Sequence, residues 1–245
     1  MNSDLKQAKY VYLLVLFIAF PIFCNASAYW MDVKGSGKVN EPVQIRIYYG
    51  NIEESGIRVP LKGPELTLTG EFKISVVDGE GRSRPIVMAL SGDGWEGTFT
   101  PSEKGVYQIL GINDTHPVVD RSKTGGINVL PVDYLCAAYA VENTGSVKKP
   151  AQFLDIITER QGTRVLVKAF KNGRRAVLNT KLRVFNPENW EKELSLNAEG
   201  EAVFLPTMKG LYIIREDWTD QRPGSYKGMP YSGIRHRCNY FLLVQ

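Results

Sequence analysis

The sequence contains one nine-residue pattern twice, and this repeat constrains the fold more than any other feature of the chain. Residues 99–107 (FTPSEKGVY) and residues 204–212 (FLPTMKGLY) both follow the pattern F-x-P-x-x-K-G-x-Y. The copies lie 105 residues apart, which is about the length of one β-sandwich domain and far beyond the period of about 20–50 residues of solenoid repeats. The repeat therefore predicts two similar β-sandwich domains in tandem.

Each copy of the pattern is expected to form a corner between two strands. The Phe ends one strand, the Pro cannot donate a hydrogen bond to the ladder, and the Gly is free to take a positive φ angle. The next strand then begins immediately. A Tyr at the start of such a strand is typical of the tyrosine corner of Greek-key sandwiches, so we assign structural roles to Tyr107 and Tyr212.

Strand patterns dominate the rest of the chain, and no segment shows sustained helical periodicity. The clearest alternation of apolar and polar residues covers 43–49. The expected fold class is all-β, with two tandem Ig-like β-sandwich domains after a signal peptide. We place the N-terminal β-sandwich at 29–143, a polar linker at 144–150 and the C-terminal Ig-like β-sandwich at 151–245.

The first 28 residues are typical of a secretory signal peptide. Lys6 and Lys9 precede an uncharged, mostly apolar run of 15 residues, and Ala26-Ser27-Ala28 is a small-residue cleavage site. The run is short for a membrane span, which needs about 20 residues. We expect a periplasmic protein that begins at Tyr29 and has no stable membrane insertion after cleavage; an uncleaved anchor is the alternative.

The net charge limits the kinds of partner that the chain can bind, and its cysteines limit the disulfide bonds that it can form. The formal net charge is +4 and the basic residues are scattered, so we expect no binding of nucleic acid. Cys136 and Cys238 would both remain in the exported chain. An oxidising compartment would allow a disulfide between them, and two buried free thiols are the alternative.

The chain resembles a bacterial domain-of-unknown-function family, numbered 4198. Residues 29–32 (YWMD) and 35–50 (GSGKVNEPVQIRIYYG) resemble the opening of that family. Further matches in the family's order are residues 165–167, Gly173, Val184, Gly200, Ala202, Phe204, residues 210–212 and residues 233–236. The family is grouped with periplasmic components of nickel and cobalt uptake. The resemblance implies an accessory protein for such a metal, with a membrane permease or an envelope protein as its partner.

Four residues are candidate ligands for nickel or cobalt. His236 and Cys238 are two apart on an expected strand, so their side chains share one face. His116 and Asp120 lie in an expected loop over 113–126, which would have to reach the terminal strand to complete the set. The alternative is that His236 and Cys238 are simply packed and hydrogen-bonded in the sheet. Many members of the similar family carry a His where this chain has Ser27 and Ala28.

A second candidate site is an aromatic loop. Trp218, Tyr226 and Tyr231 fall in a Gly- and Pro-rich segment, 218–233. Exposed aromatic side chains on a sandwich loop can stack on a glycan or anchor an envelope protein; alternatively they fold back over the edge of a sheet. The chain has no nucleophile elbow, no H-E-x-x-H motif and no P-loop, so we expect a protein without catalytic activity.

Overall fold

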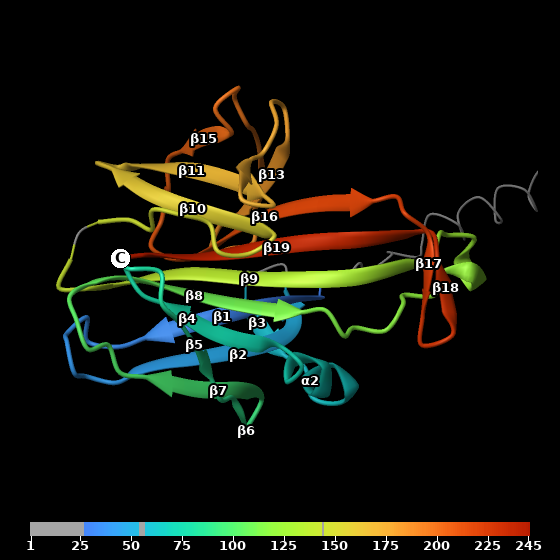
Figure 1. The fold of residues 1–245 in the computed structure, drawn as a ribbon, viewed down its shortest axis with the longest axis horizontal. Helices are drawn as coiled ribbons and strands as arrows, with labels where there is room; N and C mark the ends of the chain where they lie inside the picture. Colours follow the sequence, from blue (N-terminus) through green and yellow to red (C-terminus); the bar gives the residue numbers. More distant parts are fainter. Residues whose placement is uncertain (1–26, 54–56, 144) are drawn as a thin grey trace, which may run out of the picture.

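The computed structural model describes residues 27–53, 57–143 and 145–245. Most of the predicted signal peptide lies outside the described residues. As expected, the chain is nearly all β (Figure 1). Its strands form an eight-stranded central sheet, two smaller sheets and one separate hairpin.

The central sheet has the strand order β14-β13-β16-β19-β9-β8-β4-β5. Its strands are β4 (Lys73–Val77), β5 (Ser83–Ile86), β8 (Gly105–Asn113), β9 (Val129–Val141), β13 (Lys181–Phe185), β14 (Glu191–Ser195), β16 (Gly210–Asp220) and β19 (Gly233–Val244).

An N-terminal sheet and a C-terminal sheet flank the central one. The N-terminal sheet consists of β1 (Ser27–Lys34), β2 (Val43–Ile52), β3 (Arg58–Pro60), β6 (Ala89–Ser91) and β7 (Gly94–Phe99). The C-terminal sheet consists of β10 (Leu154–Gln161), β11 (Arg164–Lys171), β12 (Arg174–Arg175) and β15 (Glu201–Phe204). The hairpin pairs β17 (Gly224–Tyr226) with β18 (Met229–Tyr231).

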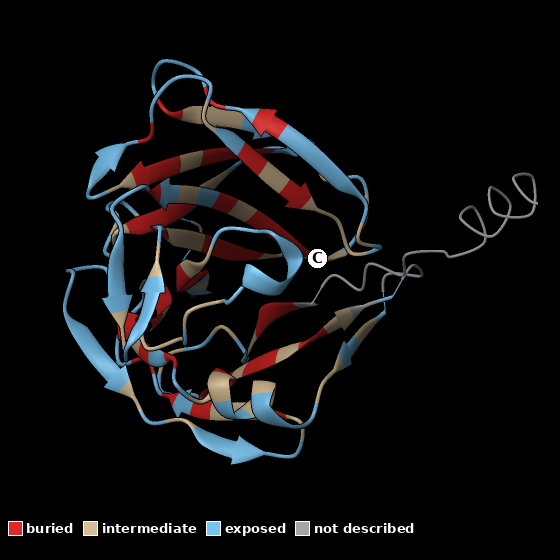
Figure 2. Cartoon of the chain, turned by 90° about the vertical axis from the view of Figure 1, so that its right-hand side faces the viewer, coloured by how far each residue is buried: buried red, intermediate tan, exposed pale blue. Residues whose placement is uncertain are grey.

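The two flanking sheets pack on opposite faces of the central sheet. Side chains alternate between the faces of a strand, and the two hydrophobic cores follow this alternation. Ile109, Leu135 and Ile213 pack with the N-terminal sheet, whereas Leu110 and Ile214 pack with the C-terminal sheet. Buried segments therefore lie between three layers (Figure 2).

The central sheet joins the two halves of the chain through one parallel strand pair. β9 from the N-terminal half pairs with β19 from the C-terminal half, from Gly233 opposite Val129 to Phe241 opposite Ala137. The polar segment 145–150 lies outside the strands. The halves that the repeat predicts thus share one sheet.

Both copies of the repeated pattern form tyrosine corners, which confirms the sequence-based interpretation. The Tyr107 hydroxyl donates to Glu103 O at 2.9 Å and accepts from Glu103 N at 3.2 Å. The Tyr212 hydroxyl donates to Met208 O at 3.2 Å and accepts from two backbone amides at 3.1 Å. In each corner the Phe ring lies against the Tyr ring, with centroids 5.6 and 5.9 Å apart.

Several elements differ from the sequence-based expectation. The sequence pattern predicts separate strands over 127–132 and 134–141, but the structure has one strand, β9 (Val129–Val141), that runs through Pro131. β8 pairs with β9 only from Asp133 onward, and a strand tolerates proline where one side has no neighbour. The strand that the pattern predicts over 85–90 is interrupted, with its ends in β5 and β6. A short helix, α2 (Pro64–Thr69), was not predicted, since six residues give too little periodicity to detect. The 3₁₀ turn η1 (Ser122–Thr124) lies in the expected loop.

The tyrosine corners predict a specific loss of stability. Replacing Tyr212 by Phe keeps the ring and removes three hydrogen bonds of the hydroxyl, so two amides and one carbonyl lose their partner. We expect a loss of about 1–3 kcal/mol in the free energy of unfolding by urea denaturation. Tyr139→Phe removes a hydroxyl that accepts one hydrogen bond, from Gly37 N, among the described residues, and should cost less. Equal stability of Tyr212→Phe and the wild type would contradict the assigned role.

Candidate functional site

The structure separates the predicted site residues into two groups. His116, Asp120, Tyr226 and Tyr231 belong to two segments, 114–128 and 221–232, that meet at one end of the central sheet; we call these segments the loop–hairpin end. The other group, Trp218, His236 and Cys238, lies on the face of the central sheet that the C-terminal sheet covers.

The first segment of the loop–hairpin end is closed on itself by hydrogen bonds. Val119 and Val129 exchange backbone hydrogen bonds of 2.9 and 3.3 Å. Asp120 Oδ1 accepts from Ser122 N at 2.9 Å, and hydrogen bonding from Ser122 lowers the pKa of the Asp120 carboxyl. Asn128 Oδ1 accepts from Arg121 N at 2.8 Å. The Asp120 side chain thus has a structural partner within its own loop.

The β17–β18 hairpin rests on this closed loop (Figure 1). Ser232 N donates to Asn128 O at 3.0 Å, and Asn128 Nδ2 donates to Pro230 O at 3.4 Å. The Tyr226 hydroxyl donates to Thr115 O at 3.4 Å. The loop and the hairpin therefore stabilise each other's position. The two segments, which the sequence analysis treated as separate candidate sites, form one surface.

Apolar side chains remain exposed on this surface. Ile127 is 66% exposed and Met229 is 41% exposed. Tyr226 and Tyr231 are half-buried, and Lys227 Nζ lies 5.2 Å from the Tyr226 ring centroid. Seen from this end, the molecule presents largely exposed loop and hairpin segments in front of its buried layers (Figure 2).

His236 lies in a cluster of aromatic rings rather than near His116. Its ring centroid is 4.8 Å from Phe153 and 5.2 Å from Trp218, and its Nδ1 is 3.0 Å from the Tyr134 hydroxyl. Burial lowers the pKa of His236. Lys171 Nζ lies 4.2 Å from the Trp218 ring centroid and covers it. Trp218 itself belongs to β16 and not to the hairpin, so it is packed apart from Tyr226 and Tyr231.

Cys238 and Cys136 form a buried pair of free thiols. Their Sγ atoms are 3.2 Å apart, and both residues have no exposed surface. Gln152 Nε2 donates to Cys136 Sγ at 3.3 Å. Burial raises the pKa of both thiols, which suppresses the thiolate that metal binding and exchange reactions need.

The four candidate metal ligands are not brought together. His116 is half-buried, and its Nδ1 contacts Pro117 O at 2.8 Å, while Asp120, His236 and Cys238 have the partners described above. Within residues 27–53, 57–143 and 145–245, no three His, Cys, Asp or Glu side chains gather in a group suited to a metal ion.

Sequence reasoning missed two buried carboxylic acids beside the thiols. Asp155 is fully buried and accepts from Gln108 Nε2 at 3.1 and 3.2 Å; burial raises the pKa of Asp155 to about 6. Glu216 is 2% exposed, and its Oε2 has no hydrogen-bond partner among the described residues. Burial raises the pKa of Glu216 to about 8. The alternation of Tyr212, Ile214 and Glu216 along β16 was the available signal, because it directs Glu216 inward.

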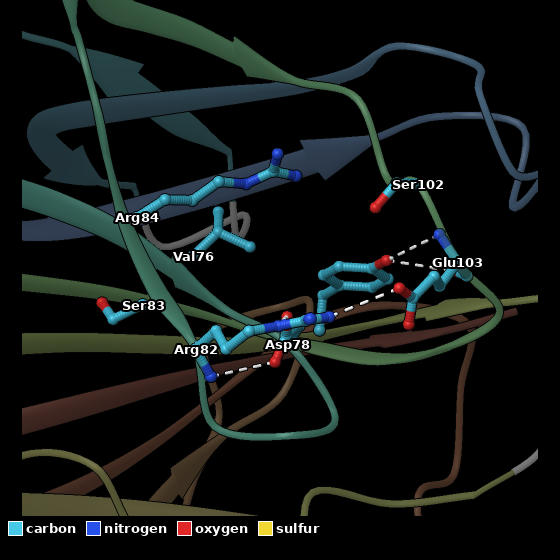
Figure 3. A pocket seen from close by; sticks show the side chains of 8 residues that line it. Val76, Asp78, Arg82, Ser83, Arg84, Ser102 and Glu103 are labelled. Atoms are coloured by element: carbon cyan, nitrogen blue, oxygen red, sulfur yellow. Dashed lines mark hydrogen bonds and ion pairs between the residues drawn. The ribbon is translucent and has the colours of Figure 1, made fainter.

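A cavity of about 280 Å³ lies beside the first tyrosine corner (Figure 3). Arg82 pairs there with Asp78 at 2.7 Å and with Glu103 at 3.4 Å, and Tyr107 binds the Glu103 backbone. The side chains that line this cavity are therefore largely committed to the corner itself, and we assign it a structural role.

Comparison with known proteins finds a distant structural similarity. No protein-family model matches the chain, and no curated protein matches it. Among solved structures, dimeric latent PorU from Porphyromonas gingivalis aligns with 89% of this chain and 20% of that chain, at 9% identity and a TM-score of 0.22. The chain thus spans about a fifth of PorU. No helix in the part of the chain that the structure describes is long and apolar enough to cross a membrane.

The environment of Glu216 predicts a pH dependence of stability. Its pKa is raised from 4.5 to about 8 in the folded chain, so between these values the folded state holds a proton that the unfolded state releases. Stability should therefore fall as pH rises through this window, by up to about 1.4 kcal/mol per pH unit. Asp155 contributes in the same direction at lower pH.

The variant Glu216→Gln isolates this contribution. The introduced amide stays neutral at all pH values. The difference in unfolding free energy between the Glu216→Gln variant and the wild-type chain, measured by urea denaturation from pH 5 to 9, should therefore grow in favour of the variant as pH rises. The exposed Glu199→Gln is the matched control and should follow the wild type. A pH-independent difference for Glu216→Gln would show that the carboxyl is not buried as described.

Proposed function

We propose that this chain is an exported, non-catalytic binding protein that recognises a protein of the cell envelope through its loop–hairpin end. The observation that carries the proposal is the exposure of Ile127 and Met229 on two segments that are joined by one backbone hydrogen bond and two side-chain hydrogen bonds. A surface that is rigid before binding loses less conformational entropy on association.

The residue types favour a protein over a glycan. Tyr and Met are enriched at the centres of protein interfaces, and both occur on the hairpin. Sugar recognition depends instead on exposed aromatic faces, but Lys227 lies over the Tyr226 ring and Lys171 over the Trp218 ring. A membrane permease is one partner of the proposed kind, in keeping with the resemblance to accessory components of nickel and cobalt uptake.

Charge-introducing variants of the exposed apolar residues test this function. Because Ile127 and Met229 are exposed, Ile127→Asp and Met229→Asp should leave the thermal midpoint nearly unchanged while placing a charge in the contact. The immobilised 29–245 chain is incubated with solubilised envelope protein, cross-linked, and its partners are quantified by mass spectrometry. We expect at least a tenfold loss of the specific partner with either variant.

The control is Leu205→Asp, which adds the same charge to an exposed apolar residue beside the second tyrosine corner. The proposal would be contradicted if both Ile127→Asp and Met229→Asp still captured the partner. It would also be contradicted if Leu205→Asp lost the partner to the same extent. A chelator-reversible rise in thermal midpoint with Ni²⁺ or Co²⁺, abolished by His116→Ala or His236→Ala, would point instead to a metal-binding protein.

A further inference from the structure

One face of the central sheet carries a group of arginines over which no sheet packs among the described residues. The N-terminal sheet reaches β9 and β19 through its edge strand β1. Beyond Ile213 and Phe241, which pack under that sheet, the same face of β13, β16 and β19 turns polar. We call it the arginine face; it consists of Arg183, Arg215, Asp217, Arg235 and Arg237.

The Asp217 carboxylate already forms ion pairs with two of these arginines. Arg183 Nη2 donates to Asp217 Oδ2 and Arg237 Nε donates to Asp217 Oδ1, both at 2.6 Å. Burial opposes ionisation, but Arg237 and Arg183 together lower the pKa of Asp217. One carboxylate thus serves two guanidinium groups.

Arg215 lies between these arginines without a carboxylate of its own. Its Nε donates to Asn239 Oδ1 at 2.7 Å, and its guanidinium lies 5.0 Å from the Phe185 ring centroid. Among the described residues it makes no ion pair within 4.0 Å. Burial, and then the positive charge of Arg237, lower its pKa to about 9. Its charge is therefore held beside other cations with little compensation.

Arg235 adds a second poorly compensated cation. Its Nη2 is 3.8 Å from Asp133 Oδ2, which is outside hydrogen-bond distance, and its Nε is buried without a partner among the described residues. Asp133 is almost fully buried, and this burial raises its pKa. The face thus has four arginines against three acids: Asp217, Asp133, whose buried carboxyl resists ionisation, and Glu191, whose Oε2 lies 4.0 Å from Arg183 Nη1.

We propose that Arg215, with Arg183, Arg235 and Arg237 around it, binds a carboxylate of the partner protein. A guanidinium presents a planar fork of donors that matches a carboxylate in a bidentate pair. An acidic side chain placed here would supply the negative charge that the face lacks, and the half-buried setting would strengthen the pair relative to one in water.

The arginine face borders the loop–hairpin end. Asp133 lies opposite Asn113, the last residue before the loop, and Arg235 lies opposite Thr219, shortly before the hairpin segment. One partner can therefore cover both surfaces, with apolar residues against the loop–hairpin end and acidic residues against the arginine face. The inference rests on the proposed function for the identity of its ligand as a protein.

The test uses defined probes and one charge-removing substitution. Hexaglutamate, hexalysine, sodium sulfate and phosphatidylglycerol vesicles are titrated against the 29–245 chain in low salt. We expect the chain to bind hexaglutamate in preference to the others, with an affinity that falls as salt is raised. Arg215→Met keeps an apolar side chain against the Phe185 ring but removes the guanidinium group. It should weaken hexaglutamate binding at least tenfold. Arg164→Met, on an exposed residue of β11, is the matched control.

The rise in thermal midpoint that hexaglutamate causes separates binding from a merely structural role. Arg215→Met removes both the repulsion by neighbouring arginines and the hydrogen bond to the buried Asn239, so its own midpoint does not discriminate. Hexaglutamate should raise the midpoint of the wild type and of Arg164→Met, but not that of Arg215→Met. Arg215→Lys keeps the positive charge but lacks the paired N–H donors of a guanidinium, so it should bind hexaglutamate with intermediate affinity. This variant replaces Arg215→Met in the test if Arg215→Met does not fold.

Three outcomes would overturn the inference: unchanged hexaglutamate binding by Arg215→Met, equal binding of hexalysine, or tighter binding of sulfate or vesicles that the variant abolishes. Met229→Asp should bind hexaglutamate like the wild type, so a failure of the loop–hairpin proposal is distinguishable from a failure of this one.

Discussion

The parallel pairing of β9 with β19 is the interaction on which the rest of the structure depends. It joins strands about a hundred residues apart in sequence and makes one sheet of the two halves. Over residues 135–137 and 238–241 every residue of the two strands is buried, between the N-terminal sheet on one face and the C-terminal sheet on the other. Parallel pairs of this kind are normally covered on both faces.

This shared sheet also explains where the proposed binding surfaces lie. The flanking sheets are offset, so in the part of the chain that the structure describes no sheet covers one face of the region around β13 and β16. There the sequence supplies arginines and acids instead of apolar side chains. The same strands carry the loop–hairpin end beyond the sheet. The β9–β19 pair thus leaves one end and one face of the described structure for the binding that we propose, consistent with the tendency of recognition residues to lie on loops held by a rigid scaffold.

The all-β class and the two tyrosine corners could be predicted from sequence because both depend on local patterns, alternation and a fixed-spacing repeat. The sharing of a sheet could not, since the β9–β19 pairing is a long-range choice that no local pattern encodes. For the same reason the sequence could not show that His236 packs among Tyr134, Phe153 and Trp218 rather than near His116. The meeting of the loop with the hairpin depends on Asn128, a residue with no distinctive motif.

Native-state hydrogen exchange followed by mass spectrometry, with increasing urea, tests the central role of this strand pair most directly. If β9 and β19 hold the halves together, their amides should exchange last and through a single global unfolding event that also exposes β4, β8, β13 and β16. Two separate unfolding events, with the segment from β10 to β19 opening while β4, β8 and β9 stay protected, would contradict this account and show two independent sandwiches.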